Sequence, residues 1–551
     1  MSGIKRAVVT LLTGISNILL CAAILQFFTV FIDENKIGIK PVFPILFFSI
    51  SLVSLALYLL SGKDAVKRTW AFKFIRLILE KGVKLFQHKP FALLTGLFIF
   101  YSTLYVVIGT LRYSNFYASV RDIGNVYQAL WNTLHGEFLI NSIKGNTHRF
   151  LDHVEPIILI FLPLVKAFKS PLVLVTAQNI AIFLSIFPLY LLSRLWVKNP
   201  YLIVAIIFSY VAYMPIRGIL IYDYHTISLF VPIFFFALYF LDMKKYGLYF
   251  LFVLLSALCK ETIGFKLLFF GLALAIFRQK QRGVGILTVA LGIIQLYIVF
   301  VLVIPALGGS YMHSSLYEHL GDTVWEKVMS PIMNPRVFWG EIFNYKTLNY
   351  LFMTLAPLLF LPIFEPLTLI PLAIIYAQLI LPEGSGTINY KKHYAAEFLP
   401  FLFYGYILVL AKIEKARGLG EKRVKAMAMC LLVLAALFYE KPDIQYLLKF
   451  AKPVSSDVKT IKEAIRLYVP PDASVAANAC IAAHMLNRRH IYPVERHRDF
   501  PVDYVVVHES LCPPYPLKND EVFLKELESM KYELVFRSGS LSIYRNPEST
   551  P

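Results

Sequence analysis

Long apolar runs recur in this chain from residue 7 to residue 440, and they constrain its fold more than any other feature. A helix needs about 20 apolar residues to cross ~30 Å of hydrocarbon, where unpaired backbone groups find no partner. Of the 551 residues, 58% are hydrophobic and 16% are charged, which is too apolar for an ordinary soluble domain. The sequence therefore predicts a polytopic α-helical membrane protein with about 13 transmembrane helices.

The expected spans differ in length, and the shorter ones can merge in pairs or re-enter the same face of the membrane. They lie near residues 7–31, 41–61, 90–111, 171–195, 200–215, 226–241, 247–259, 263–277, 284–305, 347–364, 366–381, 396–411 and 424–440.

Basic residues set the expected orientation. Eight lysines and arginines lie in the linker at residues 63–89, so the positive-inside rule places this linker and the N-terminus in the cytoplasm. Within it, residues 70–86 have the pattern of an interfacial helix, although a solvated cationic linker explains them as well. Because the net charge of +19 gathers in short loops of this kind, it indicates topology rather than a nucleic-acid partner.

Alternation of the spans then assigns the remaining loops to faces. It holds only if the apolar residues 155–168 do not cross the membrane. The outer face would carry residues 112–170, 216–225, 306–346, 382–395 and everything after 440.

The tail from about residue 452 changes character, because helical and strand-like patterns alternate in it. Strands are expected near 474–477, 490–494, 503–508, 532–537 and 541–545, and helices near 457–468, 479–487 and 520–531. We therefore expect a small extramembrane α/β domain on the outer face. It contains no glycine-rich phosphate loop. It holds Cys480 and Cys512, between which a disulfide is an open option, and no cysteines at metal-ligand spacing.

Acidic residues stand beside histidine in the first large outer loop, at Asp122 and in the run Asp152, His153 and Glu155. Such groups can deprotonate an acceptor hydroxyl or hold a divalent cation near a phosphate. The alternative for Asp122 and Asp152 is that each caps the helix after it.

Further polar residues fall at the outer ends of later spans. Arg217, Lys260 and His393 are candidates for binding an anionic headgroup, and Asp223 and His225 for binding acceptor hydroxyls or orienting Asp122. Headgroup anchoring, an aromatic belt, and an ion pair between Lys260 and Glu261 are the simpler alternatives.

The order of these motifs resembles the membrane proteins grouped as domain of unknown function 2079, which belong with the C-type glycosyltransferase (GT-C) superfamily. The resemblance covers roughly residues 90–545, so the first two spans, in residues 1–62, are an addition. We therefore divide the rest of the chain into the basic linker at 63–89, a GT-C-like transmembrane part at 90–440 and the α/β tail at 452–551. The segments that carry it are Asp122, residues 128–132, 152–156 and 223–225, Lys260 with Glu261, and 393–401.

This resemblance implies an enzyme that takes a sugar from a polyprenyl-phosphate carrier at the outer leaflet, using an acidic residue of the first outer loop, here Asp122. It also implies that some helices in that loop do not cross the membrane. The alternation of the spans requires the same of residues 155–168. Many members have two adjacent acids where this chain has Arg121 and Asp122. A divalent cation, with Asp122 and Asp152 as ligands, therefore stays an open alternative.

Two other functions remain as alternatives. A transporter or flippase for a lipid-linked precursor predicts ionisable residues at mid-bilayer depth and internal repeats. A non-catalytic membrane scaffold predicts that Asp122 can be replaced without loss of function. The sequence specifies neither the sugar, the acceptor nor the oligomeric state, and the expected partners are membrane lipids and a lipid-linked sugar.

Overall fold

The computed structural model describes residues 80–548 except 312, 385, 417–420, 440–442, 497–498, 512–524, 526 and 528. The expected spans near 7–31 and 41–61, most of the basic linker, and most of the expected helix near 520–531 lie outside the described residues.

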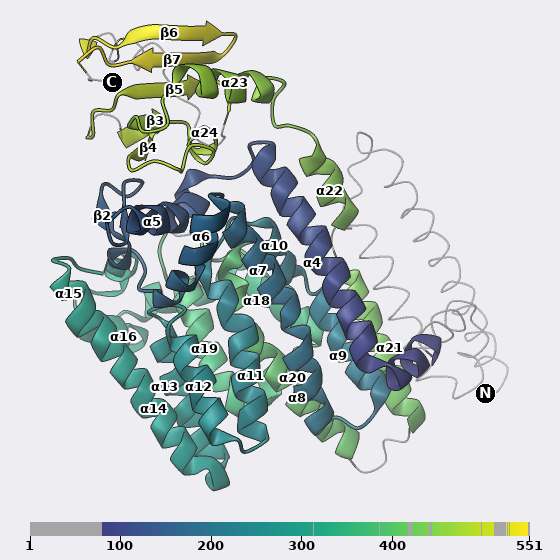
Figure 1. Cartoon of the computed structure of the whole chain (residues 1–551). Coiled ribbons are helices and arrows are strands. Elements are labelled where there is room, and N and C mark those ends of the chain that lie inside the picture. Colours follow the sequence, from purple (N-terminus) through teal and green to yellow (C-terminus); the bar gives the residue numbers. More distant parts are fainter. Residues whose placement is uncertain are drawn as a thin grey trace.

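A bundle of apolar helices makes up most of the described chain, with a sheet at one end of it (Figure 1). We call the end that carries the sheet the tail-facing end. The helices of the bundle are α4 (Pro90–Ser114), α7 (Leu172–Leu184), α8 (Ile186–Trp196), α9 (Pro200–Ala212), α10 (Met214–Ile221), α11 (Phe230–Asp242), α12 (Tyr246–Ala257), α13 (Ile263–Phe277), α14 (Arg282–Tyr297), α18 (Tyr345–Leu355), α19 (Pro366–Ile380), α20 (Leu399–Lys415) and α21 (Glu421–Leu437).

Shorter helices lie in the connections of this bundle. They are α5 (Asn125–Leu134), α6 (Leu162–Phe168), α15 (Ile304–Ala306), α16 (Val324–Met333) and α17 (Pro335–Ile342), and α22 (Asp443–Ala451) leads to the sheet. A two-stranded ribbon, β1 (Ile140–Asn141) with β2 (Thr147–His148), follows α5.

Three helical stretches of the described chain are long and apolar enough to cross a membrane: Pro90–Ser114, Leu172–Trp196 and Gln279–Ala306. They lie where spans near 90–111, 171–195 and 284–305 were expected. The pair α9 and α10 passes the same test together, with a 40° bend between its helices.

The expected span near 347–364 is not one helix. Helix α18 ends at Leu355, and Leu359 and Phe360 adopt left-handed backbone angles, with φ of 54° and 55°. Such angles break a right-handed helix, because they carry Cβ against the following carbonyl. Residues 356–364 are therefore two short 3₁₀ turns, Ala356–Leu358 and Leu361–Phe364.

Glycines let α13 and α14 approach closely. A Cβ on Gly271 would lie 2.7 Å from the carbonyl oxygen of Gly285 on the partner helix. A Cβ on Gly292 would lie 2.7 Å from the carbonyl oxygen of Gly264. Small residues allow this backbone contact between apolar helices, so the hairpin that carries Lys260 and Glu261 at the start of α13 rests on a close-packed pair.

Residues 155–168 begin and end at the tail-facing end. Glu155 lines a cavity there, and the carbonyl of Lys169 accepts a hydrogen bond from Asn487 of the tail. The segment forms a 3₁₀ helix, Pro156–Phe161, followed by α6, and it packs beside α5. It therefore does not traverse the bundle, as the alternation of the expected spans required.

The tail contains helix α23 (Val458–Tyr468), helix α24 (Ala479–Ala482) and one mixed sheet. Its strands are β3 (Val475–Ala477), β4 (Ile491–Pro493), β5 (Tyr504–His508), β6 (Glu533–Ser538) and β7 (Leu541–Arg545), in the order β4-β3-β5-β7-β6. Strands β4, β3 and β5 are parallel, and β7 is antiparallel to both β5 and β6. These strands lie within a residue or two of the ranges expected from the sequence.

Candidate functional site

Asp122 lies in a π-helix, Val120–Gly124, between α4 and α5. The residue that caps this π-helix is Ser119, and the next helix, α5, has no side-chain cap. The capping alternative for Asp122 is therefore wrong. Its side chain is 29% exposed and faces a cavity of about 960 Å³ at the tail-facing end. A carboxylate that faces a cavity and caps no helix is a candidate for chemistry.

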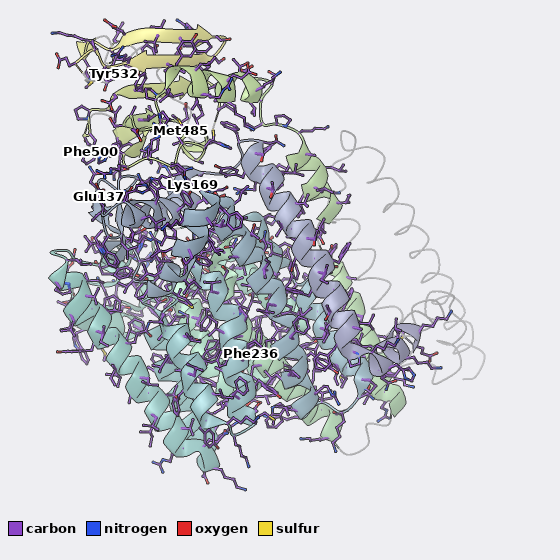
Figure 2. All side chains as sticks on the ribbon, in the orientation of Figure 1. Glu137, Lys169, Phe236, Met485, Phe500 and Tyr532 are labelled. Carbon is purple, nitrogen blue, oxygen red and sulfur yellow. The ribbon has the colours of Figure 1, made fainter. Side chains whose placement is uncertain are left out.

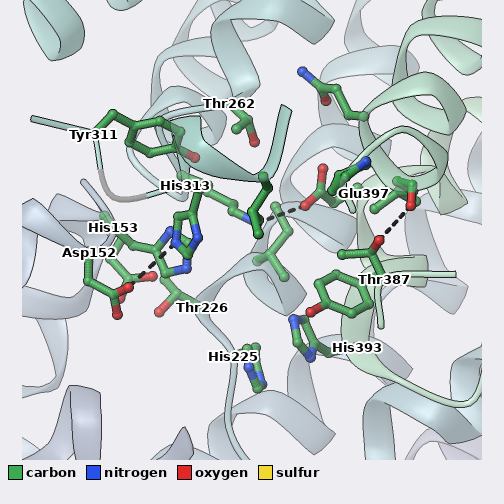
Figure 3. A pocket seen from close by; sticks show the side chains of 18 of the residues that line it. Asp152, His153, His225, Thr226, Thr262, Tyr311, His313, Thr387, His393 and Glu397 are labelled. Carbon is green, nitrogen blue, oxygen red and sulfur yellow. Dashed lines mark hydrogen bonds and ion pairs between the residues drawn. The ribbon is translucent and has the colours of Figure 1, made fainter. Parts of the chain in front are cut away.

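Seven of the ten residues singled out in the sequence line this cavity. They come from the first loop, the loop after α10, the turn between α12 and α13, and the segment before α20. They are Asp122, Asp152, His153, Glu155, His225, Lys260 and His393. Figure 3 labels Asp152, His153, His225 and His393 among them.

Burial and a neighbouring carboxylate raise the pKa of Asp122. Loss of water contributes most, the negative charge of Asp223 adds to it, and Arg112 opposes both; together they raise the pKa to about 7. Asp223 is ion-paired with Arg112 and accepts a hydrogen bond from the backbone N–H of Ser119 at 3.0 Å. Asp122 is thus a carboxyl that exchanges its proton near neutral pH.

His225 is the nearest histidine to Asp122, with its Nε2 atom 3.7 Å from Oδ1. Its Nδ1 lies 3.0 Å from the carbonyl oxygen of Asp223, so Nδ1 carries the proton and Nε2 presents a lone pair. The ring stacks on His393 with centroids 3.3 Å apart. Burial lowers the pKa of His225 to about 3, which keeps the ring neutral.

Asp152 does not cap the helix after it either, because that helix, Pro156–Phe161, begins after Glu155 and has no side-chain cap. Cations hold Asp152 instead. Its Oδ2 atom accepts a hydrogen bond from Arg149 at 2.5 Å, and Arg149 also binds Glu155 at 2.5 Å. Its Oδ1 atom lies 3.8 Å from Lys144 and 3.5 Å from Nε2 of His313. Burial alone would raise the pKa of Asp152, but the surrounding histidines and cations lower it, so the group is ionised.

Glu261 orients His153, the residue that follows Asp152 in the chain. The Nδ1 atom of His153 lies 3.0 Å from Glu261, which also accepts hydrogen bonds from Tyr311 at 3.1 Å and the backbone N–H of Val154 at 3.2 Å. Since a carboxylate only accepts, Nδ1 donates and Nε2 is left for another partner.

Asp152, His153 and His313 together form a group that could hold a metal ion. Each offers one ligand atom, and these atoms lie within 4.8 Å of one another. The rings of His153 and His313 stack with centroids 4.9 Å apart. Asp122 is not part of this group, so of the two possible ligands considered from the sequence only Asp152 fits.

Lys260 is not paired with Glu261, which corrects one expected alternative. Its Nζ atom lies 2.8 Å from Glu397, whose other oxygen lies 2.8 Å from the buried Lys266. One buried carboxylate therefore serves two lysines, so its single negative charge offsets only one of their two positive charges.

Three expected site residues, Arg217, Asp223 and Glu261, do not line the cavity. Arg217 is 4% exposed and is bound to Asp443 at 2.8 Å, where it fastens α22 to α10. The assignment of Arg217 as a headgroup ligand is therefore wrong, because its guanidinium group is buried and forms an ion pair with Asp443. The negative charge of Asp223 raises the pKa of Asp122, and Glu261 accepts a hydrogen bond from His153.

The sequence interpretation missed Arg149, His313 and Glu397. His313 lies in a loop without a helical pattern, and Glu397 stands at the edge of the apolar run expected to be a span. An acidic residue at the mouth of an apolar helix is itself a signal, because it needs a buried cation as its partner.

Helices with apolar, exposed surfaces around a polar cavity at one end define a helical membrane protein. The chain belongs to the family of predicted membrane proteins described as domain of unknown function 2079, whose family model matches residues 112–521, more than half of the chain. The fold is similar to the crystal structure of ArnT from Cupriavidus metallidurans in the apo state. That similarity has a TM-score of 0.48 and 11% sequence identity, and covers 82% of this chain and 97% of that chain. None of the curated proteins matches the chain.

Proposed function

We propose that this protein is a membrane glycosyltransferase that moves a sugar from a polyprenyl-phosphate donor to an acceptor at the outer face of the membrane. The observation that carries the proposal is Asp122, a carboxyl group with a pKa raised to about 7 that faces a large cavity. Such a group removes a proton from an acceptor hydroxyl at neutral pH. The resemblance of the motifs to GT-C enzymes supports the same assignment.

Cationic side chains support the donor half of the reaction. Lys144 and Lys327 line the cavity, and Lys144 is one third exposed. When the glycosidic bond to the carrier breaks, negative charge develops on the leaving phosphate, and a nearby ammonium group stabilises it. Lys144 replaces Arg217 in this role.

Two observations support an outward-facing cavity. Cys480 in the tail is disulfide-bonded, and disulfides persist in oxidising compartments. At the other end of the bundle, Trp196, Asp242 and Arg278 form one polar network. The basic loops that flank these residues include Arg194, Lys198, Lys244, Lys245, Lys280 and Arg282, as expected of a cytoplasmic face.

The geometry also supports a divalent cation at Asp152, His153 and His313. Two imidazole nitrogens and one carboxylate oxygen suit zinc better than magnesium. Glu261, which accepts a hydrogen bond from His153, matches the carboxylate that commonly orients a zinc-binding histidine. A cation there would supply positive charge to the donor phosphate. The protein's own part is to hold the three ligands, with Arg149 fixing Asp152 and Tyr311 fixing Glu261.

The test is sugar release from a panel of radiolabelled polyprenyl-phosphate sugars by purified protein in lipid. Asp122→Asn should abolish turnover while donor binding persists. The matched control is Asp322→Asn, an exposed acid at the same end that does not line the cavity. Tight donor binding without turnover by the wild type, with acceptors varied, would shift the assignment to a transporter or a scaffold.

A further inference from the structure

Helix α5 buries polar side chains on the face that points away from the bundle. Tyr127 and Gln128 are fully buried and Asn132 is 1% exposed. Buried polar groups require partners, because a buried donor or acceptor without one has lost its hydrogen bonds to water and gained nothing in return. The partners of these three side chains come mainly from the tail, between α24 and β4 (Figure 2 labels Met485 of the tail, and Lys169 and Glu137 on the other side of the junction).

Gln128 is the centre of this contact. Its Nε2 donates to the carbonyl oxygen of Arg489 at 2.8 Å and to the hydroxyl of Ser142 at 2.8 Å, and its Oε1 accepts from the backbone N–H of Ser142 at 2.9 Å. Asn132, one turn later, donates to the same carbonyl of Arg489 at 3.2 Å. A single tail carbonyl thus binds two amides of α5.

Ser142 extends the contact past α5. Its hydroxyl donates to the carbonyl oxygen of Ile491 at 2.7 Å and accepts from the N–H of Ile491 at 2.8 Å. Because Ile491 is the first residue of β4, the first loop is joined to the edge of the tail sheet.

The same tail segment reaches the turn that carries Asp122. Tyr127 donates to Asn487 at 2.6 Å, and Asn487 donates to the carbonyl of Lys169 after α6. A Cβ on Gly124 would lie 2.9 Å from the side chain of Leu486. The π-helix that holds Asp122 is therefore packed directly under the tail.

We infer that the α/β tail is a positioning domain for the loop that carries Asp122, and that Gln128 is the positioning residue that couples the two. Helix α5 begins three residues after Asp122, so its docking on the tail fixes where the carboxylate points into the cavity. The catalytic meaning of this coupling rests on the proposed function, whereas the coupling itself does not.

The contact can be measured without any substrate. The full chain in lipid nanodiscs, carrying a protease recognition sequence inserted between the exposed residues Lys452 and Pro453, is cleaved and washed in non-denaturing buffer. Amide hydrogen exchange is followed over residues 119–134. Gln128→Glu keeps the size of the side chain and removes both donors. The matched control, Gln281→Glu, changes a buried glutamine near the opposite end that donates to Leu241.

We expect the cleaved tail to stay bound in the wild type and the control and to dissociate from Gln128→Glu, with exchange over residues 119–134 roughly tenfold faster or more. Ser142→Ala is the second variant, in case Gln128→Glu does not fold, and should act in the same direction. Retention of the tail with unchanged exchange in both variants would overturn the inference, as would an equal effect in Gln281→Glu.

Where a labelled donor is turned over, Gln128→Glu should also move the acid limb of the pH profile to lower pH, because a loosened loop lets water reach Asp122. A purely structural role would lower the rate at every pH alike and would contradict positioning. Failure of every donor with the wild type would count against the proposed function, while tail release and exchange would still decide the coupling.

Discussion

The carboxylate of Asp122 and the imidazole of His225 lie 3.7 Å apart, although they come from two loops separated by the six α-helices α5 to α10. The hydrogen bond from Nδ1 of His225 to the carbonyl of Asp223 directs its Nε2 lone pair toward the carboxyl group. The pair therefore contains one group that gains or loses a proton near neutral pH and one neutral acceptor beside it.

Turnover should rise with pH through about 7. Asp122 can accept a proton only when ionised, and its pKa is raised to about 7, so each pH unit below this value should lower the rate about tenfold. The measurement is the initial rate of sugar release from pH 5 to pH 9. A flat profile over this range in protein that stays folded would contradict Asp122 as the base.

Asp223→Asn should shift that limb to lower pH. The negative charge of Asp223 disfavours ionisation of Asp122, and its removal also frees Arg112 to approach. Both changes favour the ionised carboxyl, so its pKa should fall. Rate profiles of the two proteins at matched expression test this, and a shift to higher pH would show that Asp223 acts in another way.

His225→Phe should lower turnover about 10- to 100-fold. Phenylalanine keeps a ring stacked on His393 but has no lone pair to face the carboxyl group of Asp122 once that group has taken the acceptor's proton. The control is His135→Phe, because His135 is exposed and does not line the cavity. If both variants retained the wild-type rate, His225 would be a packing residue.

The arrangement of the helices was largely predictable from hydrophobicity, because a span must be a continuous apolar run. The helices α7 and α8 lie where the apolar run at 171–195 predicted a span. The alternation of the spans across the membrane was enough to require that residues 155–168 stay at one end. The break at Leu359 was not predictable, since neither leucine nor phenylalanine favours a positive φ.

The site was predictable as a set of residues but not as a set of contacts. Local motifs marked Asp122, His153 and Lys260, because charge next to an apolar run is costly and marks a special position. Their partners lie far away in the sequence: Glu261 binds His153, and Glu397 binds Lys260. Proximity in the chain favoured Lys260 with Glu261, and only the fold shows otherwise.

Glu397→Gln should destabilise the protein by about 3–5 kcal/mol, because it leaves Lys260 and the buried Lys266 without their shared carboxylate. Thermal unfolding in detergent, followed by tryptophan fluorescence, measures the loss. Adding Lys266→Met should restore part of it, since one unmatched charge is then removed. The control Glu326→Gln changes a partly exposed acid in a capping box, where the amide oxygen of glutamine can still accept the backbone hydrogen bond, and should have a small effect.

The protein should bind roughly one zinc ion per chain through Asp152, His153 and His313. Protein whose affinity tag has been cleaved off is stripped with a chelator, dialysed against zinc and analysed for bound metal. Asp152→Asn and His313→Asn should each lose most of the zinc. Glu261→Gln should weaken binding about 10- to 100-fold, because its amide orients His153 less firmly than the carboxylate.

His135→Asn is the control for zinc binding, since this exposed histidine lies outside the group. Equal zinc in the wild type, Asp152→Asn and His313→Asn would mean that the metal binds elsewhere, and less than about a tenth of an ion per chain in the wild type would rule the site out. Because Arg149 and Lys144 also face Asp152, the two results separate a metal centre from a purely ionic cluster. An ionic cluster would keep Asp152→Asn destabilising while zinc had no effect on the unfolding temperature, whereas a metal centre would gain stability in proportion to the logarithm of the free zinc concentration.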